Sequence, residues 1–356
     1  MSCASNQRKT SSAALRASRA GRPPLWAVML LLAVVLVALS AAALCLGAYE
    51  VPLRDIPGIL LSPLTRPQDP AWSAMEANVV LQVRVPRVLG AILVGAALAV
   101  AGAAYQGTFR NPLVSPDLLG VSSGACIGAA VAILGDWGLV GKQVAAFVGG
   151  IAAVACTMLI PRLLRRDSTV TLVLAGIIVG GFCGSVLGII KYVADPETEL
   201  PEIVYWSMGS LAKVTAATLW YVGPVIAVCI TAMLSLRWRI NLLSLGDREA
   251  KALGVNLRRE RGAVIALATL LTASATCVAG TVGWVGLVIP HLARFAVGPN
   301  ATRSLPVACV MAAVFLLVVD TLSRISGHEI PLGIITGLVG TPFFIVLLAR
   351  QKGAMA

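Results

Sequence analysis

The chain contains 356 residues, of which 58% are hydrophobic and 12% are charged, and its mean hydropathy is +0.88. A soluble domain carries about 25% charged residues, so this composition excludes an ordinary soluble protein and indicates one integral membrane domain in contact with lipid. The formal net charge of +12 would suit nucleic acid. The basic residues are distributed as a membrane-orientation signal, however, so no nucleic-acid partner is predicted.

The N-terminal segment 1–24 is polar and basic and contains no acidic residue. It resembles the start of a signal peptide, but the apolar run 25–48 is too long for a signal-peptide core and lacks a clear cleavage site. We therefore expect a cytoplasmic tail over 1–24, a membrane domain over 25–350 and a short cytoplasmic tail over 351–356.

Ten apolar segments follow along the chain and predict an all-α, polytopic membrane protein. Their approximate ranges are 25–48, 86–106, 118–135, 143–161, 169–193, 217–236, 262–281, 282–297, 305–323 and 331–349. A helix needs about 20 residues to cross the hydrocarbon core of a bilayer. The segments 118–135 and 282–297 are shorter, so we expect them to be broken, tilted or shielded by protein.

The lysines and arginines orient these segments. With the N-terminus inside, 20 of the 28 basic residues fall in inner segments and 8 in outer segments. Because basic residues concentrate on the cytoplasmic side, both termini are predicted to be cytoplasmic. The outer loops are mildly acidic, and 200–213 is predicted to form a short amphipathic helix there, with Tyr205 and Trp206 at the interface.

The sequence contains no convincing motif for catalysis, metal binding or nucleotide binding. The GxxxxGK[ST] phosphate loop is absent, so ATP and Mg would have to bind a partner chain, and no cofactor is predicted on this one. His291 and His328 lack neighbouring ligands and no CxxC pair occurs, so no metal site is predicted. All cysteines except Cys3 lie in apolar runs, where we expect them to act as small hydrophobic residues.

Two features inside the apolar segments have both a structural and a functional interpretation. Gly176, Gly180, Gly184 and Gly188 recur every four residues, which favours either simple helix packing or a helix that lines a pathway or a subunit seam. Asp320 is the only acid well inside a segment, with Arg324 four residues on. It predicts either a proton relay or an i,i+4 ion pair.

The segment 242–256 is short, charged and helix-like, and lies between two long apolar runs. Its charged residues are Asp247, Arg248, Glu249 and Lys251, and Gly254 is placed to end the helix. The segment is either a solvated connector or a docking helix for a cytoplasmic subunit.

Six blocks along the chain together resemble a known family. They are VRVPRVLG (83–90), YQGTFRNPLVSPDLLGVSSGA (105–125), YWSMGSL (205–211), the segment 242–256, GWVGLVIPH (283–291) and EIPLGIITGLVGTPFF (329–344). In order, they are similar to the FecCD- and BtuC-like permease subunits of ABC importers for iron chelates (siderophores), haem and cobalamin. The resemblance runs from about residue 25 to 350, and Trp284 stands where Phe is more usual.

The resemblance implies a type II ABC importer permease fold in the inner (plasma) membrane. It implies a second permease copy, most simply as a homodimer, two cytoplasmic ATPases that bind ATP and Mg, and a periplasmic substrate-binding protein. The resemblance places an ATPase-docking helix within 241–257 and binding-protein docking at three arginines, with the fifth and tenth spans lining the pathway. The ATPase-docking residues are Leu245, Gly246, Asp247, Glu249, Ala250, Leu253 and Gly254, and the arginines are Arg84, Arg87 and Arg324.

The substrate predicted from this resemblance is a metal chelate, with a ferric siderophore preferred and haem or cobalamin as alternatives within the same family. An ion-coupled secondary transporter is the alternative from another class, and it would need an ion or proton site near the midplane, for which Asp320 is the available residue. A membrane enzyme would need converging catalytic groups, and the sequence shows none, so the chain is predicted to be a transport subunit.

Overall fold

A computed structural model describes residues 23–47, 49–65, 67, 70–165, 169–325 and 329–352 of the chain. The described residues form helices and no strand, which confirms the all-α prediction. The predicted tails 1–24 and 351–356 lie almost entirely outside the described ranges, as do Cys3 and His328.

A helix is present in each of the ten predicted apolar segments. These helices are α2 (Leu25–Cys45), α5 (Val85–Phe109), α6 (Val121–Leu134), α7 (Gly138–Leu163), α8 (Thr169–Val193), α10 (Ala216–Ser235), α13 (Leu257–Ala279), α14 (Val285–Val297), α15 (Ala301–Ile325) and α16 (Leu332–Lys352). Within the described ranges, seven helices are long and apolar enough to cross a membrane, and shorter apolar helices include α6, α14 and the Leu332–Val346 part of α16. The helix α5 continues from α4 (Ala74–Asn78) through a π-helical turn, η1 (Val79–Arg84), so this span has 36 residues.

The two segments predicted to be short are broken at their N-terminal sides. The 3-10 turn η2 (Pro116–Leu119) precedes α6, and Gly120 between them has a φ of 83°. The chain before α14 is non-helical, with Trp284 at a φ of 70°. A residue other than glycine pays a steric penalty at positive φ. The Trp284 side chain lies against α16, where its ring carbons would be 2.6 Å from a β-carbon added at Gly340.

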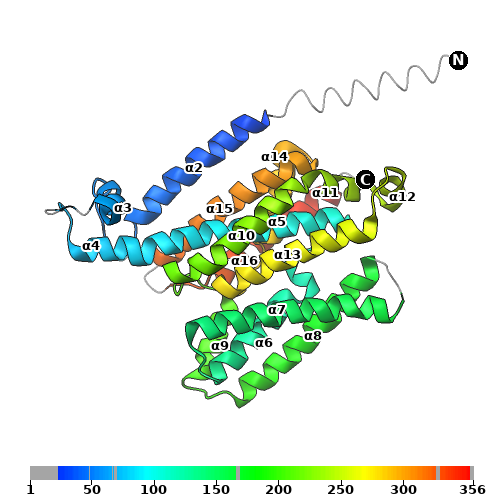
Figure 1. The fold of residues 1–356 in the computed structure, drawn as a ribbon, viewed down its shortest axis with the longest axis horizontal. Coiled ribbons are helices and arrows are strands. Elements are labelled where there is room, and N and C mark those ends of the chain that lie inside the picture. The colour runs from blue at the N-terminus through cyan, green and yellow to red at the C-terminus, as the bar shows by residue number, and fades with distance from the viewer. Residues whose placement is uncertain are drawn as a thin grey trace.

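The centre of the molecule is α5, which packs against α13, α14, α15 and α10 (Figure 1). Its small residues allow the helices to approach closely. A β-carbon added at Gly102 would lie 1.8 Å from the carbonyl oxygen of Gly286 on α14, and one at Gly95 would lie 2.4 Å from that of Ala312 on α15. Such backbone contact is how helices associate in lipid, where the hydrophobic effect does not draw them together.

The helices α6, α7 and α8 form a second group beside this core (Figure 1). The short helix α9 (Glu199–Met208) covers one end of α6, where Ile203 is buried against Ala130 and Ile133. The predicted amphipathic helix over 200–213 is therefore present, although it ends at Met208. Trp206 packs on the protein core and Tyr205 donates a hydrogen bond to Ser210 at 3.2 Å, so both residues contact protein as well as facing outward.

The two ends of the helix bundle differ in what they carry. One end holds the start of α2, the short helices α11 (Arg237–Leu245) and α12 (Asp247–Ala252) and the end of α16 (Figure 1). We call it the α12 end. The opposite end, the α9 end, holds α9, α3 (Ile56–Thr65) and α4 (Figure 1).

Candidate functional site

The connector between α10 and α13 is built as a compact helical turn. The helix α12 begins after Gly246, whose φ is 134°, and carries Asp247 and Glu249 in its first turn and Lys251 in its last. This order places negative charge at the positive end of the helix dipole and positive charge at its negative end. The segment predicted from its charge pattern as a helix is therefore a helix, bounded by glycines.

Gly254 ends α12 in a Schellman motif. Its φ is 77°, its amide donates to the Lys251 carbonyl at 2.9 Å, and the Val255 amide donates to the Ala250 carbonyl at 3.0 Å. These two bonds satisfy carbonyls that the helix end would otherwise leave unpaired. The predicted helix stop at Gly254 is confirmed. The next helix starts at once, because the Asn256 side chain accepts a hydrogen bond from the Arg259 amide.

Asp247 fixes the connector to the membrane helices. Its carboxylate accepts two hydrogen bonds from Arg261 of α13, at 2.6 and 3.1 Å, and lies 3.7 Å from the guanidinium of Arg110 at the end of α5. The hydrogen bonds from Arg261 hold the pKa of Asp247 below its usual range. A bidentate arginine–carboxylate pair is geometrically specific, so α12 has a defined position on α13.

The predicted ATPase-docking residues fall on two sides of the connector. Leu245 and Leu253 are 54% and 61% exposed, and Glu249 and Gly254 are also exposed. Ala250, in contrast, is fully buried, and Gly246 is buried as well. The prediction that Ala250 contacts a partner directly is therefore wrong, because its side chain is buried within its own subunit. An α12 of six residues is too short for sequence periodicity to fix which side faces inward.

The predicted binding-protein arginines form a buried cluster at the α9 end. Arg87 of α5 pairs with Asp320 of α15 at 2.8 Å and with Glu329 at 2.8 Å, and Arg324 lies 3.3 Å from Asp320. The predicted i,i+4 pair between Asp320 and Arg324 is present. Its more important partner, Arg87, is 233 positions away in sequence, and Glu329 was not predicted to take part.

Arg84 and Arg324 also bind the carboxyl end of α2. Arg84 donates to the carbonyls of Leu44 at 2.6 Å, of Cys45 at 2.9 Å and of Tyr49, and Arg324 donates to that of Ala43 at 3.1 Å. The last carbonyls of a helix have no partner within the helix, so they attract such donors.

These contacts change one expectation about the three arginines. Docking on a partner would need exposed side chains, but Arg84 and Arg87 are 3% exposed and the side chain of Arg324 is 8% exposed. Helix ends in lipid must satisfy their polar groups inside the protein, and these arginines do so. Their docking role stays a prediction, and Glu329, whose side chain is 46% exposed and pairs with Arg87, is an exposed part of the cluster.

The four glycines of α8 do not share one environment. A β-carbon added at Gly176 would lie 1.9 Å from the carbonyl oxygen of Leu118 on η2, so this glycine is needed for packing. Gly184 and Gly188 have nothing within 4 Å of such a carbon and are exposed. Nearer the middle of α8, Ile178 and Phe182 are also exposed, on a different side of the helix from Gly184 and Gly188. The half of α8 toward the α9 end therefore presents an apolar surface that this chain leaves uncovered.

No group of three or more histidine, cysteine, aspartate or glutamate side chains lies together within the described ranges. His291 stacks edge-on against Phe295, with ring centroids 4.9 Å apart, and its Nδ1 lies 3.4 Å from Arg294. Six of the seven described cysteines are buried or half-buried, as small hydrophobic residues are, and Cys156 is exposed. That the chain holds no metal or cofactor of its own stays a prediction.

Comparison with known proteins identifies relatives over almost the whole chain. The model of the FecCD transport family matches residues 31–350. The molybdate import system permease MolB of Haemophilus influenzae is 38% identical over 90% of this chain and 95% of its own. The hemin transport system permease HmuU of Yersinia pestis is 36% identical over 93% and 97%. A solved inward-facing structure of a putative metal-chelate type ABC transporter aligns with a TM-score of 0.80 at 37% identity, covering 92% of this chain and 98% of that one.

Proposed function

This chain belongs to the FecCD transport family and is an integral transport subunit of the inner (plasma) membrane, and we propose that it forms the pathway of an ATP-driven importer for a ferric siderophore. In this proposal ten helices span the membrane, both termini are cytoplasmic, and the α12 end faces the cytoplasm. Two copies of the chain, two ATPases and a periplasmic binding protein make up the transporter. The basic residues support this orientation, since 20 of 28 fall in the segments predicted from the sequence to be cytoplasmic.

The observation that carries the proposal is the built connector at the α12 end. A charged helix flanked by two exposed leucines is held by Asp247 and Arg261 against a membrane helix, and no part of the chain that the structure describes covers these leucines. The sequence has no phosphate loop. A separate ATPase seated on α12 accounts for both facts. When the ATPases close on ATP, α12 moves, and the Arg110–Asp247–Arg261 contacts pass that motion to α5 and α13.

The choice of a siderophore rests on the uncovered face of α8. In the proposed dimer the exposed sides of α8 meet its copy or line the pathway, and they offer Ile178, Phe182 and open glycines rather than charges. An apolar lining suits an organic chelate, whose shell hides the metal, better than a bare ion. Haem and cobalamin are organic ligands of the same kind and are the first alternatives. Molybdate is a further candidate because a relative at 38% identity is named for it.

A secondary transporter is less compatible with the structure. Asp320, the acid that such a mechanism would need, is fully buried and paired with Arg87 and Arg324. A proton relay requires a carboxylate that exchanges protons with a path, whereas two arginines hold this one in place.

The test is substrate uptake by the reconstituted transporter. The chain, its ATPase and the binding protein encoded beside it are placed in proteoliposomes and offered a ferric siderophore, haemin, cobalamin and molybdate in parallel. We expect ATP-dependent uptake of the ferric siderophore, and none with an ATPase that cannot hydrolyse ATP. Uptake of another compound in the panel would replace the substrate assignment. Uptake that persists without any ATPase would refute the importer itself.

A further inference from the structure

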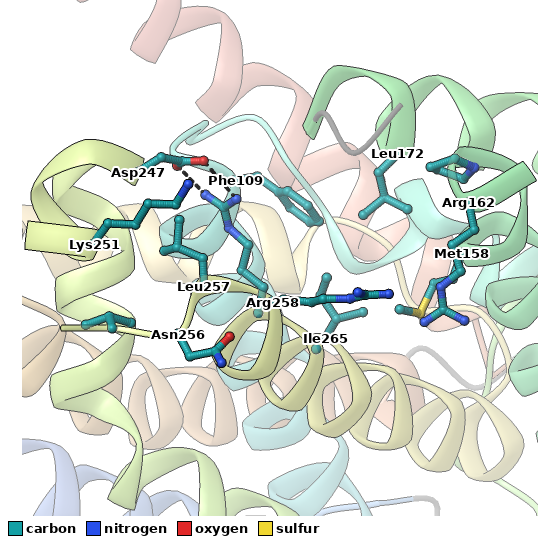
Figure 2. A pocket seen from close by; sticks show the side chains of 14 residues that line it. Phe109, Met158, Arg162, Leu172, Asp247, Lys251, Asn256, Leu257, Arg258 and Ile265 are labelled. Carbon is teal, nitrogen blue, oxygen red and sulfur yellow. Dashed lines mark hydrogen bonds and ion pairs between the residues drawn. The ribbon is translucent and has the colours of Figure 1, made fainter. Parts of the chain in front are cut away.

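A cavity of about 520 Å³ opens beside the connector at the α12 end. It lies between the end of α7, the start of α8, the end of α5 and the start of α13. Its volume falls in the range of about 300–1,000 Å³ that is typical of small-molecule sites. Figure 2 shows Met158 and Arg162 on one side of the cavity and Asp247 and Lys251 on the other. The cavity therefore bridges the second helix group and the docking connector.

The lining of the cavity is strongly cationic. Arg162, Lys251, Arg258 and Arg261 line it, against Asp247 as the acid. Asp247 is already bound by Arg261. Within the described ranges, Arg162, Lys251 and Arg258 make no ion pair, and the buried Nε of Arg261 has no hydrogen-bond acceptor. Like charges that converge without a counter-ion attract an anion, and arginine forks match the oxygens of a phosphate group.

Another part of the lining is apolar and lies deeper along the helices. Met158 is one turn before Arg162 on α7, and Ile265 is one turn after Arg261 on α13, while Leu172 and Phe109 complete this part. Among the cationic side chains, Arg162 stands on the last turn of α7, Lys251 on the last turn of α12 and Arg258 on the first turn of α13. In the proposed orientation, the charged part is level with the inner headgroups and the apolar part is level with the acyl chains.

We propose that this cavity binds the phosphodiester headgroup of an anionic phospholipid of the inner leaflet. Arg162, Arg258 and Lys251 hold the phosphate oxygens, and Met158 and Leu172 contact the first part of an acyl chain. Basic pockets between membrane helices on the cytoplasmic side are suited to such headgroups. The lipid joins α7 to α13 next to α12, so it stiffens the connector on which the ATPase is expected to sit. The site does not depend on which substrate is carried.

The test measures lipid retention by the purified transporter. Native mass spectrometry follows the binding of palmitoyl-oleoyl phosphatidylglycerol, of the zwitterionic phosphatidylcholine with the same chains, and of soluble glycerophosphoglycerol. We expect saturable binding of phosphatidylglycerol, with weaker binding of the other two. Equal binding of phosphatidylcholine would overturn the anionic site, and tighter binding of the soluble headgroup would overturn the lipid as its source.

The variant Arg162→Gln/Arg258→Gln removes two of the cations and leaves a neutral polar side chain at each position. Each basic residue near a membrane surface contributes about fivefold to the binding of an anionic lipid, so affinity should fall about 30-fold. The variant Arg162→Lys/Arg258→Lys should retain most of the binding, which separates lost charge from lost folding. The matched control is Arg237→Gln/Arg303→Gln, which removes equal charge from the α12 end outside the cavity. Equal losses in the cavity and control variants, or no loss in either, would overturn the proposal.

Discussion

Replacing Leu253 by glutamate isolates the role of the α12 connector. Leu253 is 61% exposed, so the substitution leaves the folded subunit close to its original stability, within about 0.5 kcal/mol. Fully burying a leucine contributes about 1.5–3 kcal/mol. Since most of the Leu253 side chain is still exposed, burying it against the ATPase should contribute about 1–2 kcal/mol to the free energy of docking. A buried, unpaired glutamate adds a further penalty. We expect the dissociation constant for the ATPase to rise at least about tenfold, which corresponds to 1.4 kcal/mol.

The measurement is the affinity of the detergent-purified subunit for its ATPase by isothermal titration calorimetry, with thermal unfolding as the check on folding. Leu164→Glu is the matched control, because Leu164 is 59% exposed and follows α7 at the same end of the molecule, on a different element from α12. Ala250→Glu should instead destabilise the subunit itself, since Ala250 is fully buried. If Leu253→Glu and Leu164→Glu bind the ATPase equally well, α12 is a connector and not a docking helix.

Three further outcomes follow from the contacts described. Asp320→Asn should lower the free energy of unfolding by about 3–5 kcal/mol, because two buried arginines lose their counter-charge; Glu329→Gln, at a half-exposed site, should cost far less in the same thermal-unfolding assay. The pKa of Asp247 is lowered in the folded protein, so the charged carboxylate stabilises the fold above the usual aspartate pKa near pH 4. This stabilisation is lost as the pH falls through the lowered pKa of the folded protein. Acidification should therefore reduce the thermal stability of the wild type by this amount, and should not do so in Asp247→Asn. Gly102→Ala should prevent folding, as judged by size-exclusion chromatography, whereas Gly181→Ala, with nothing within 4 Å of its β-carbon, should fold normally.

Much of the fold is predictable because a membrane helix needs a long apolar run and little else. Each of the ten predicted segments contains a helix, and the two short ones are broken as expected. The boundaries were less predictable. The α13 helix begins at Leu257, five residues before the predicted start, because Asn256 caps a first turn that is charged and so does not register as apolar. The π-helical turn η1, which joins α4 to α5, has no sequence signal of its own.

The site was predicted in part, for a physical reason. Features that depend on neighbouring residues can be predicted from the sequence, so the positions of the charges and of Gly254 predicted the α12 helix and its end. Long-range pairing leaves no such trace. Arg84 caps carbonyls about 40 positions away, and Arg87 pairs with Asp320 across 233 positions. The sequence feature that pointed to this cluster was Asp320, the one acid well inside the apolar segments, because a buried carboxylate needs a basic partner such as an arginine at the same end of the bundle.

The two candidate docking regions are joined by one rigid element, and this bears on how the subunit would move. Arg110 at one end of α5 contacts Asp247 of the connector, and Arg87 at the other end belongs to the buried cluster. Between them, Gly95 and Gly102 hold α5 in backbone contact with α15 and α14. Interfaces packed this closely do not deform gradually. We therefore expect α5, α14 and α15 to move as one body when α12 is displaced. The face of α8 at Gly184 and Gly188 has no such contacts, so relative motion should occur there.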